Sequence, residues 1–171
     1  MFAVSFCIAA FVLRIISLAV SVRHEKALRA DGAVEFGAGN TKLLALTHIA
    51  FYIAAFTEGL HAPQPVDAVT VAGVAIYAFS MLMLAWVVKL LGRFWTVKIM
   101  IARDHDLVVH PLFRRLRHPN YFLNILPELV GLALALHAFV TLAVGLPLYL
   151  IPLITRIRQE ERAMRETFSS Y

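Results

Sequence analysis

The sequence predicts an all-α integral membrane protein with about five transmembrane helices. Of its 171 residues, 60% are hydrophobic, above the roughly 45 to 50% that is typical of globular domains, and the mean hydropathy is +0.75. The apolar residues form long runs, and most charged residues fill the gaps between them. We therefore interpret the net charge of +5 as topology determinants and contacts with membrane lipid headgroups, and not as a nucleic-acid surface.

Three apolar runs in the first part of the chain are long enough to cross a hydrocarbon core of about 30 Å. We expect the first helix over residues 2–22, the second over 43–60 and the third over 66–91. The polar, glycine-containing segment 23–42 separates the first two, and we interpret it as a loop outside the bilayer. Two prolines, in the segment 61–65, mark a tight connection before the third helix.

The last apolar block, residues 121–155, is too long for one crossing, because a single helix would measure about 50 Å at 1.5 Å per residue. Gly145, Pro147 and Pro152 interrupt this block. We therefore expect a hairpin of two short helices, over residues 121–137 and 139–155. Both ends of such a hairpin lie on the same side of the membrane.

Polar segments flank this hairpin on both sides. The basic connector 92–120 precedes it, and apolar residues alternate with other residues over 97–102, which indicates an interfacial strand or an irregular lid. The tail 156–171 follows it and reads as an amphipathic helix. Because no internal repeat or low-complexity linker is visible, we expect one domain over residues 1–171.

The positions of the basic residues predict the orientation. Apart from Arg14, the lysines and arginines lie in or beside the loop 23–42, the connector 92–120 and the tail 156–171. The positive-inside rule places these three segments in the cytoplasm.

Two polar clusters lie at the ends of the hairpin. Pro119 fits the first turn of a helix, where its missing N–H has no cost, and it places His118 beside the membrane surface. Arg156 and Glu160 are four residues apart and share one helical face. Taken alone, His118 also fits a residue at a helix start, and Arg156 with Glu160 also fits a surface ion pair. The hairpin, however, brings the two clusters together. The combined candidate site contains His118, Asn120, Tyr121, Arg156, Glu160 and Glu161.

A few ionisable residues lie inside the apolar runs. Arg14 lies about 12 Å from the cytoplasmic end of its helix, where an unpaired charge is expensive. Of the possible partners for Arg14, His48 lies closer than Glu58 to the depth of Arg14 in the membrane. Glu128 shares a helical face with the polar residues before it, so we expect it to face protein; contact with a ligand and pairing between helices remain open. The seven histidines show no metal-ligand spacing, and we predict no metal.

The first polar segment contains His24, Glu25, Lys26 and Glu35. Solvated charge is the simplest interpretation of these residues, and a lid over the site is the alternative. Trp86, near the end of a predicted helix, is expected to anchor the chain at the membrane interface.

The motif Arg-His-Pro-Asn-Tyr (117–121), followed by an apolar hairpin and by Arg-Ile-x-x-Glu-Glu (156–161), resembles the isoprenylcysteine carboxyl methyltransferase family of membrane enzymes. The stretches 23–26, 32–37 and 92–96 look like the compact bacterial branch of that family. The spaced Arg-Glu-Glu makes the motif more specific than Arg-His-Pro-x-Tyr alone. The resemblance covers nearly the whole chain.

The resemblance implies methyl transfer from S-adenosyl-L-methionine to a lipidic acceptor that enters from the bilayer. Carried over by position, Arg156 and Glu160 face the acceptor and the reacting methyl group. One departure precedes the motif: His110-Pro111-Leu112-Phe113 stands where the family commonly has Gly-Pro-Tyr or Gly-Pro-Phe, which puts the backbone of the cofactor loop in question. The implied cofactor-binding residues are Val108, Val109, Leu116, His118, Asn120, Tyr121 and Glu161.

The compact branch includes members that O-methylate long-chain pyrones or resorcinols. We therefore expect a phenolic or enolic lipid acceptor, with a prenylcysteine-like carboxylate as the second possibility, in a bacterial inner membrane with the site facing the cytoplasm. The alternatives are a phospholipid N-methyltransferase and a membrane scaffold without enzymatic activity. The sequence leaves the oligomeric state open.

Overall fold

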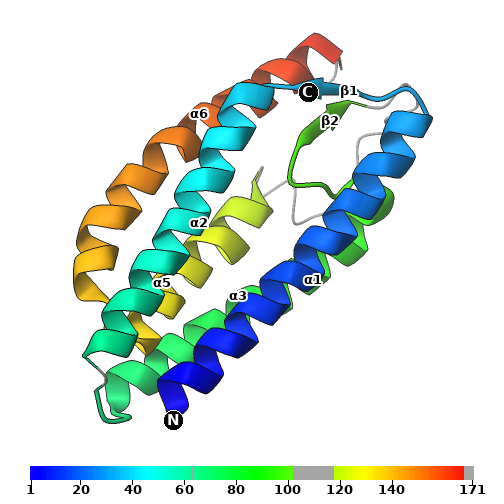
Figure 1. Ribbon diagram of the computed structural model, residues 1–171. Helices are drawn as coiled ribbons and strands as arrows, with labels where there is room; N and C mark the ends of the chain where they lie inside the picture. Colours follow the sequence, from blue (N-terminus) through cyan, green and yellow to red (C-terminus); the bar gives the residue numbers. More distant parts are fainter. Residues whose placement is uncertain (63, 102–117, 168–171) are drawn as a thin grey trace.

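The computed structural model describes residues 1–62, 64–101 and 118–167. It is an elongated helical bundle with a small β-ribbon at one end, which we call the ribbon end; the N-terminus lies at the opposite end (Figure 1). The main helices are α1 (Phe2–Ala30), α2 (Ala38–His61), α3 (Ala68–Leu91), α5 (Leu126–Ala135), which follows the π-helical turn η2 (Asn120–Ile125), and α6 (Leu146–Thr167), which follows the π-helical turn η3 (Thr141–Gly145).

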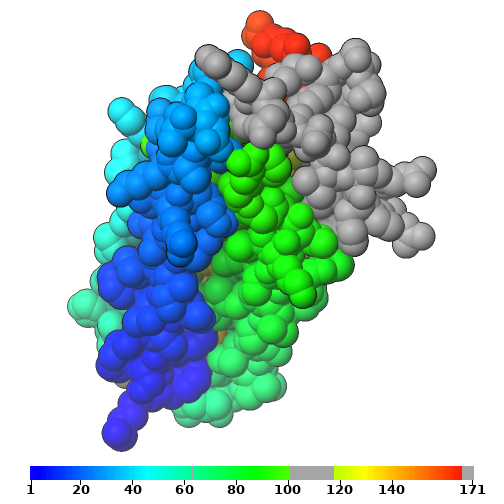
Figure 2. All heavy atoms as spheres, turned by 90° about the vertical axis from the view of Figure 1, so that its right-hand side faces the viewer, coloured from blue at the N-terminus to red at the C-terminus, as the bar shows by residue number. Residues whose placement is uncertain are grey.

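Four of the described helices are long and apolar enough to cross a membrane, and a shorter apolar helix covers Asn120–Ala135. The fold is therefore that of an all-α membrane protein, as predicted. Figure 2 shows α1 and α3 side by side on one face of the bundle, where the Phe6 and Tyr77 rings pack edge-on with centroids 5.3 Å apart. Much of the outer surface is apolar, as lipid contact requires: α1 alone exposes Ile8, Phe11, Val12, Leu13, Ile15, Ile16 and Leu18.

Helix α1 is longer than predicted. The segment 23–42 was expected to be a loop, but the helix continues for eight residues beyond Val22 and ends at Ala30. The added residues are good helix formers outside the bilayer, and an i,i+4 ion pair joins Glu25 to Arg29 at 2.8 Å. Gly32, with a φ of 81°, then turns the chain.

The β-ribbon joins two segments that are distant in the sequence. Strand β1 (Val34–Phe36) pairs antiparallel with strand β2 (Ile99–Ile101), and Glu35 lies opposite Met100. The strand predicted from the alternation in the connector is thus present. Its partner lies in the segment that was expected to be a loop. The ribbon ties the end of α1 to the chain that follows α3.

The hairpin turns back between α5 and η3. His137 has a φ of 54°, and the amide of Ala138 donates to the carbonyl of Ala133 at 2.8 Å. The carboxylate of Glu58 in α2 then accepts from the backbone amides of Val140 at 2.9 Å and Thr141 at 2.8 Å. A carboxylate at a helix start satisfies free amides and complements the helix dipole. Glu58 therefore caps the returning helix.

The returning helix does not stop at the membrane surface. A separate C-terminal helix was expected over 156–171, but α6 runs without a break to Thr167. Pro152 lies inside α6, and its carbonyl accepts a hydrogen bond from Nδ2 of Asn40 at 3.0 Å. This bond ties the middle of α6 to the start of α2. The residues beyond 167 lie outside the described chain.

Helix α5 is the buried centre of the bundle. Leu129, Leu132 and Ala133 are fully buried, and α5 packs closely against α3. A Cβ atom on Gly131 would lie 2.5 Å from the backbone nitrogen of Tyr77, so only glycine permits this approach. The contact fixes the depth of α5 in the bundle.

Candidate functional site

Arg156, on α6, is held inside the bundle near the ribbon end. Its Nε donates to the hydroxyl of Tyr121 at 3.2 Å, and its Nη1 donates to Oγ1 of Thr41 at 2.7 Å. Its Nη2 donates to the backbone carbonyl of Val97 at 2.7 Å. The residue is 4% exposed. All three acceptors are uncharged, and Arg156 forms no ion pair with a carboxylate of the described residues.

Tyr121 connects Arg156 to the acidic pair of α6. Its hydroxyl donates to Oε2 of Glu160 at 2.5 Å, and its ring stacks on His118 with centroids 5.6 Å apart. Nε2 of His118 lies 3.4 Å from Oε1 of Glu161, and Nδ1 lies 3.8 Å from Oε2 of Glu160. His118 is buried, whereas Glu160 and Glu161 are partly exposed.

Local structure explains how these side chains meet. The carbonyl of His118 accepts from the amides of Tyr121 at 3.1 Å and Phe122 at 3.3 Å, which starts the helix. Pro119 immediately precedes the first helical residue, Asn120, one position earlier than predicted. On α6, a spacing of four residues places Arg156 and Glu160 on one face.

The structure brings together His118, Tyr121, Arg156, Glu160 and Glu161 of the predicted site. Asn120 lies on the same turn, but its Oδ1 accepts from Nδ2 of Asn124 at 3.2 Å and it does not join the charged group. Three of the implied cofactor residues, Val108, Val109 and Leu116, lie outside the described residues, as does the departure at 110–113.

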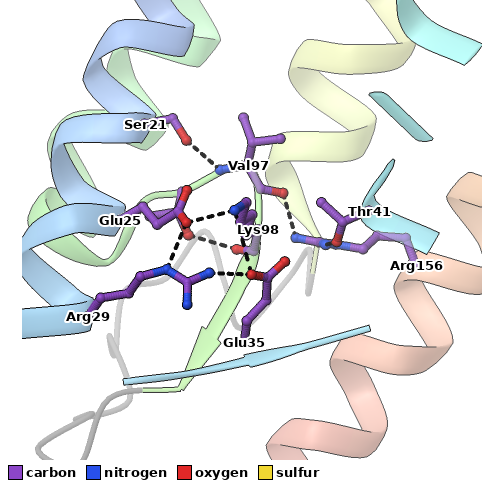
Figure 3. Close-up of polar contacts among 9 residues, drawn as sticks. Ser21, Glu25, Arg29, Glu35, Thr41, Val97, Lys98 and Arg156 are labelled. Carbon is purple, nitrogen blue, oxygen red and sulfur yellow. Dashed lines mark hydrogen bonds and ion pairs between the residues drawn. The ribbon is translucent and has the colours of Figure 1, made fainter. Parts of the chain in front are cut away.

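Two groups that hold Arg156 could not be predicted from the sequence. Thr41 is a lone hydroxyl residue near the start of α2, and Val97 contributes only its backbone carbonyl. Figure 3 shows both beside Arg156. The amide of Val97 donates to Oγ of Ser21 in α1 at 2.8 Å, so the peptide that receives Arg156 is itself tied to α1.

An ion-pair network supports the same peptide from outside (Figure 3). Nζ of Lys98 lies 2.7 Å from Glu25 and 3.5 Å from Glu35, and Arg29 pairs with both carboxylates. The hydrogen bond from Lys98 to Glu25 raises the pKa of Lys98. Glu25 and Glu35, expected either as solvated charges or as a lid, thus join α1 to the ribbon. We call Ser21, Glu25, Arg29, Glu35 and Lys98 the ribbon brace.

His24, also in the first polar segment, contacts the connector. Its Nδ1 lies 2.9 Å from the carbonyl of Trp95, and Trp95 is buried. Trp86 is exposed, and its role as an interfacial anchor stays a prediction.

The depth of Arg14 in the membrane suggested His48 as its partner, but the direct partner is another residue. Arg14 forms an ion pair with Glu128 of α5, while His48 lies 3.7 Å from the same carboxylate. The prediction that Glu128 faces protein is confirmed, because it is 0% exposed. A single sequence does not show the rotation of α5 that brings Glu128 toward α1. Among the described residues, no group of three His, Cys, Asp or Glu residues could hold a metal ion.

The arrangement has a defined chemical character. A buried guanidinium with uncharged partners keeps its positive charge available for an anionic oxygen. The partly exposed carboxylates of Glu160 and Glu161 attract a cation and can accept a proton. The site is therefore suited to hold an oxygen anion close to a cation.

Two bacterial proteins are similar to this chain over almost their whole lengths. An uncharacterized protein of Haemophilus influenzae is 47% identical over 162 residues, which cover 95% of this chain and 93% of that protein. The uncharacterized protein YpbQ of Bacillus subtilis is 27% identical over 155 residues, covering 91% and 92% of the two chains. No solved structure matches this chain.

The model of the isoprenylcysteine carboxyl methyltransferase family matches residues 73–166. This range contains His118, Tyr121, Arg156, Glu160 and Glu161. Membership points to a methyltransferase embedded in a membrane. On the strength of this match, which covers more than half of the sequence, the chain belongs to the isoprenylcysteine carboxyl methyltransferase family.

Proposed function

We propose that this protein transfers a methyl group from S-adenosyl-L-methionine to an oxygen of a lipidic acceptor at the membrane surface. The observation that carries the proposal is the environment of the Arg156 guanidinium. This guanidinium is buried, is oriented by the uncharged oxygens of Thr41, Tyr121 and Val97, and has no carboxylate partner in the described chain. Such a group stabilises an oxygen anion in a site of low dielectric.

Glu160 is the second residue of the proposed chemistry. Its carboxylate accepts a hydrogen bond from Tyr121 and lies on the same face of α6 as Arg156. It takes the proton of a phenolic or enolic hydroxyl while Arg156 holds the resulting oxygen anion. For a carboxylate acceptor no base is needed at neutral pH, and Glu160 then orients the acceptor.

The described residues fit the proposed cofactor. Nδ1 of buried His118 has no hydrogen-bond partner among the described residues, and Glu160 and Glu161 present partly exposed carboxylates beside it. A ligand that is both cationic and hydrogen-bonding satisfies this combination. We propose that His118, Asn120, Tyr121 and Glu161 hold it, together with the connector residues Val108, Val109 and Leu116. When bound, S-adenosyl-L-methionine supplies an electrophilic methyl group on a sulfonium cation.

A site at the membrane suits this reaction. When an anionic oxygen attacks a cationic donor, charge is lost on the way to the transition state, so exclusion of water favours the reaction. Transfer to an amine is the second candidate, but the positive charge of Arg156 is a poor neighbour for the amine that methylation turns into a cation. We therefore propose oxygen as the acceptor atom.

We place the protein in a bacterial inner membrane, with the site facing the cytoplasm. Arg29 lies in the last turn of α1, and Lys98 lies just before β2. The arginines after Arg156 lie on the last turns of α6, which reach the ribbon end (Figure 1). The turn between α2 and α3, at the other end, has no Lys or Arg. This asymmetry supports the proposed orientation.

The first test is binding of S-adenosylhomocysteine to the purified protein in lipid nanodiscs, measured by calorimetry. We expect saturable binding that is lost in His118→Ala. His61→Ala is the matched control, because His61 is exposed at the far end of α2 and contacts its own helix at the carbonyl of Thr57. Transfer of labelled methyl into extracted lipids then identifies the acceptor. Absence of binding by well-folded wild-type protein would overturn the proposal in favour of a scaffold.

A further inference from the structure

A second polar group lies deeper in the bundle, in the middle of the membrane-spanning helices. The hydroxyl of Tyr52 donates to Glu128, which also pairs with Arg14. The hydroxyls of Tyr52 and Tyr77 are 3.4 Å apart, and Nδ1 of His48 lies 3.3 Å from the hydroxyl of Tyr149. We call Arg14, His48, Tyr52, Tyr77, Glu128 and Tyr149 the inner cluster. Its side chains come from five helices.

The inner cluster and the candidate site share three helices with the same spacing. Seven residues separate Thr41 from His48 on α2, Tyr121 from Glu128 on η2 and α5, and Tyr149 from Arg156 on α6. Seven residues are close to two α-helical turns, so on α2 and α6 the members of each pair face the same way, about 10 Å apart along the axis. The pair on η2 and α5 spans the π-helical turn, and both of its members are buried inside the bundle. The inner cluster therefore lies beneath the candidate site on the same interior surface of the bundle.

Apart from Nη2 of Arg14 and Oε2 of Glu128, which form an ion pair with each other, two buried polar atoms in this region have no hydrogen-bond partner among the described residues. One is Oδ1 of Asn124, a residue 1% exposed that lies between Tyr121 and Glu128 on their helical face. The other is Nε2 of His48, which is 3.7 Å from Glu128. An unsatisfied buried polar group costs about 1–3 kcal/mol, and hydrocarbon offers no bulk water to satisfy it. A polar group of a bound ligand fills this role.

Two side chains of the inner cluster keep some exposed surface. The side chains of Arg14 and His48 are 21% and 18% exposed, whereas that of Glu128 is 0% exposed. At this depth in a membrane, the exposed parts face lipid. The charges of Arg14 and Glu128 cancel, so a charged ligand group would remain unpaired there. The cluster therefore suits an uncharged polar group that is carried by a lipid.

We propose that the inner cluster and Asn124 bind a second hydroxyl of the methyl acceptor, about 10 Å from the oxygen that is methylated. A hydroxyl is chosen because Oδ1 of Asn124 needs a donor, and Arg14 and His48 offer complementary partners for its oxygen. Asn124 and His48 then determine specificity for this hydroxyl. This inference rests on the proposed function and adds the chemical class of the acceptor: an uncharged lipid with two separated hydroxyls.

The test compares two synthetic acceptors in nanodiscs: a long-chain 3-alkylphenol, and the same phenol with a chain hydroxyl about 10 Å from the phenolic oxygen. Transfer of labelled methyl gives kcat/KM for each. We expect wild-type protein to favour the hydroxylated phenol by about five- to tenfold, as one hydrogen bond provides. The ratio falls to about one in Asn124→Leu and His48→Phe, and it is kept in the matched control His61→Phe.

A second measurement does not depend on methyl transfer. We expect the hydroxylated phenol to raise the melting temperature of wild-type protein more than the plain phenol does, and this difference to disappear in Asn124→Leu. Equal kcat/KM values and equal melting shifts for the two phenols, with S-adenosylhomocysteine binding intact, would overturn the inference and assign the cluster to helix packing. Loss of cofactor binding itself would instead mark failure of the proposed function.

Discussion

Arg156 and Thr41 lie 115 residues apart in the sequence and meet where α6 packs against α2, with Nη1 of Arg156 donating to Oγ1 of Thr41 at 2.7 Å. This contact, together with those to Tyr121 and Val97, orients a buried guanidinium without neutralising it. The position of Arg156 therefore depends on three elements that precede α6 in the chain.

Replacing Arg156 with lysine tests whether the planar guanidinium is required. Lysine keeps the charge but cannot contact Thr41, Tyr121 and Val97 together. We expect Arg156→Lys to lower the methyl-transfer rate by about 10²-fold or more, with S-adenosylhomocysteine binding retained. The control is Arg162→Lys, at an exposed position of the same helix. A rate within twofold of wild type would remove Arg156 from the chemistry.

Removing the hydroxyl of Thr41 tests the contact itself. In Thr41→Val a buried guanidinium N–H loses its acceptor, at a cost of about 1–3 kcal/mol, and Arg156 becomes less well oriented. We expect methyl transfer to fall by about tenfold or more. Thr47→Val is the control, because Thr47 bonds only to carbonyls of its own helix in the described chain. Equal activities of the two variants would contradict the assignment.

Replacing Ser21 tests whether the ribbon brace positions the peptide that receives Arg156. Oγ of Ser21 accepts from the amide of Val97, whose carbonyl receives Arg156. We expect Ser21→Ala to lower kcat several-fold with little change in S-adenosylhomocysteine affinity, because the peptide at Val97 loses an anchor. Ser21→Thr, which keeps the hydroxyl, should recover part of the loss. Ser5→Ala is the control, at an exposed hydroxyl near the start of α1.

Replacing Glu58 tests how much its cap stabilises the returning helix. The Glu58 carboxylate accepts from the amides of Val140 and Thr141 and from the hydroxyl of Thr141. We expect Glu58→Ala to lower the free energy of unfolding by about 1–2 kcal/mol, measured by thermal and denaturant unfolding in detergent. Glu166→Ala, at an exposed position of α6, should have a much smaller effect. Cofactor binding well below the melting temperature should not change.

Protonation of Asp67 is expected to make the free energy of unfolding depend on pH. The amide of Thr70 donates to its carboxylate at 2.9 Å, and this bond, helped by the hydroxyl of Thr70 and by His137, lowers the pKa of Asp67. A lowered pKa in the folded state stabilises the fold above the usual Asp value of about 3.9, and this stability is lost as the pH falls through the folded-state pKa. We expect the stability difference between wild type and Asp67→Asn to shrink over that range. A constant difference would contradict this assignment.

The sequence by itself determined the membrane class, the main apolar helices and the pairing of His118 and Tyr121 with Arg156 and Glu160. The first two features follow from hydrophobic length, which is a local property. The pairing follows because the block 121–155 is too long for one crossing, so a hairpin returns both clusters to one side of the membrane. The sequence did not determine the extension of α1, because charged residues suit both a loop and a helix outside the bilayer.

Only the tertiary structure decided which distant groups meet. Thr41 and the carbonyl of Val97 hold Arg156, Ser21 holds the peptide at Val97, and Glu128 pairs with Arg14. These contacts depend on the rotation and depth of each helix, which the α3–α5 glycine contact and the pairing of β1 with β2 fix. Packing between elements sets such quantities, and no local pattern encodes them.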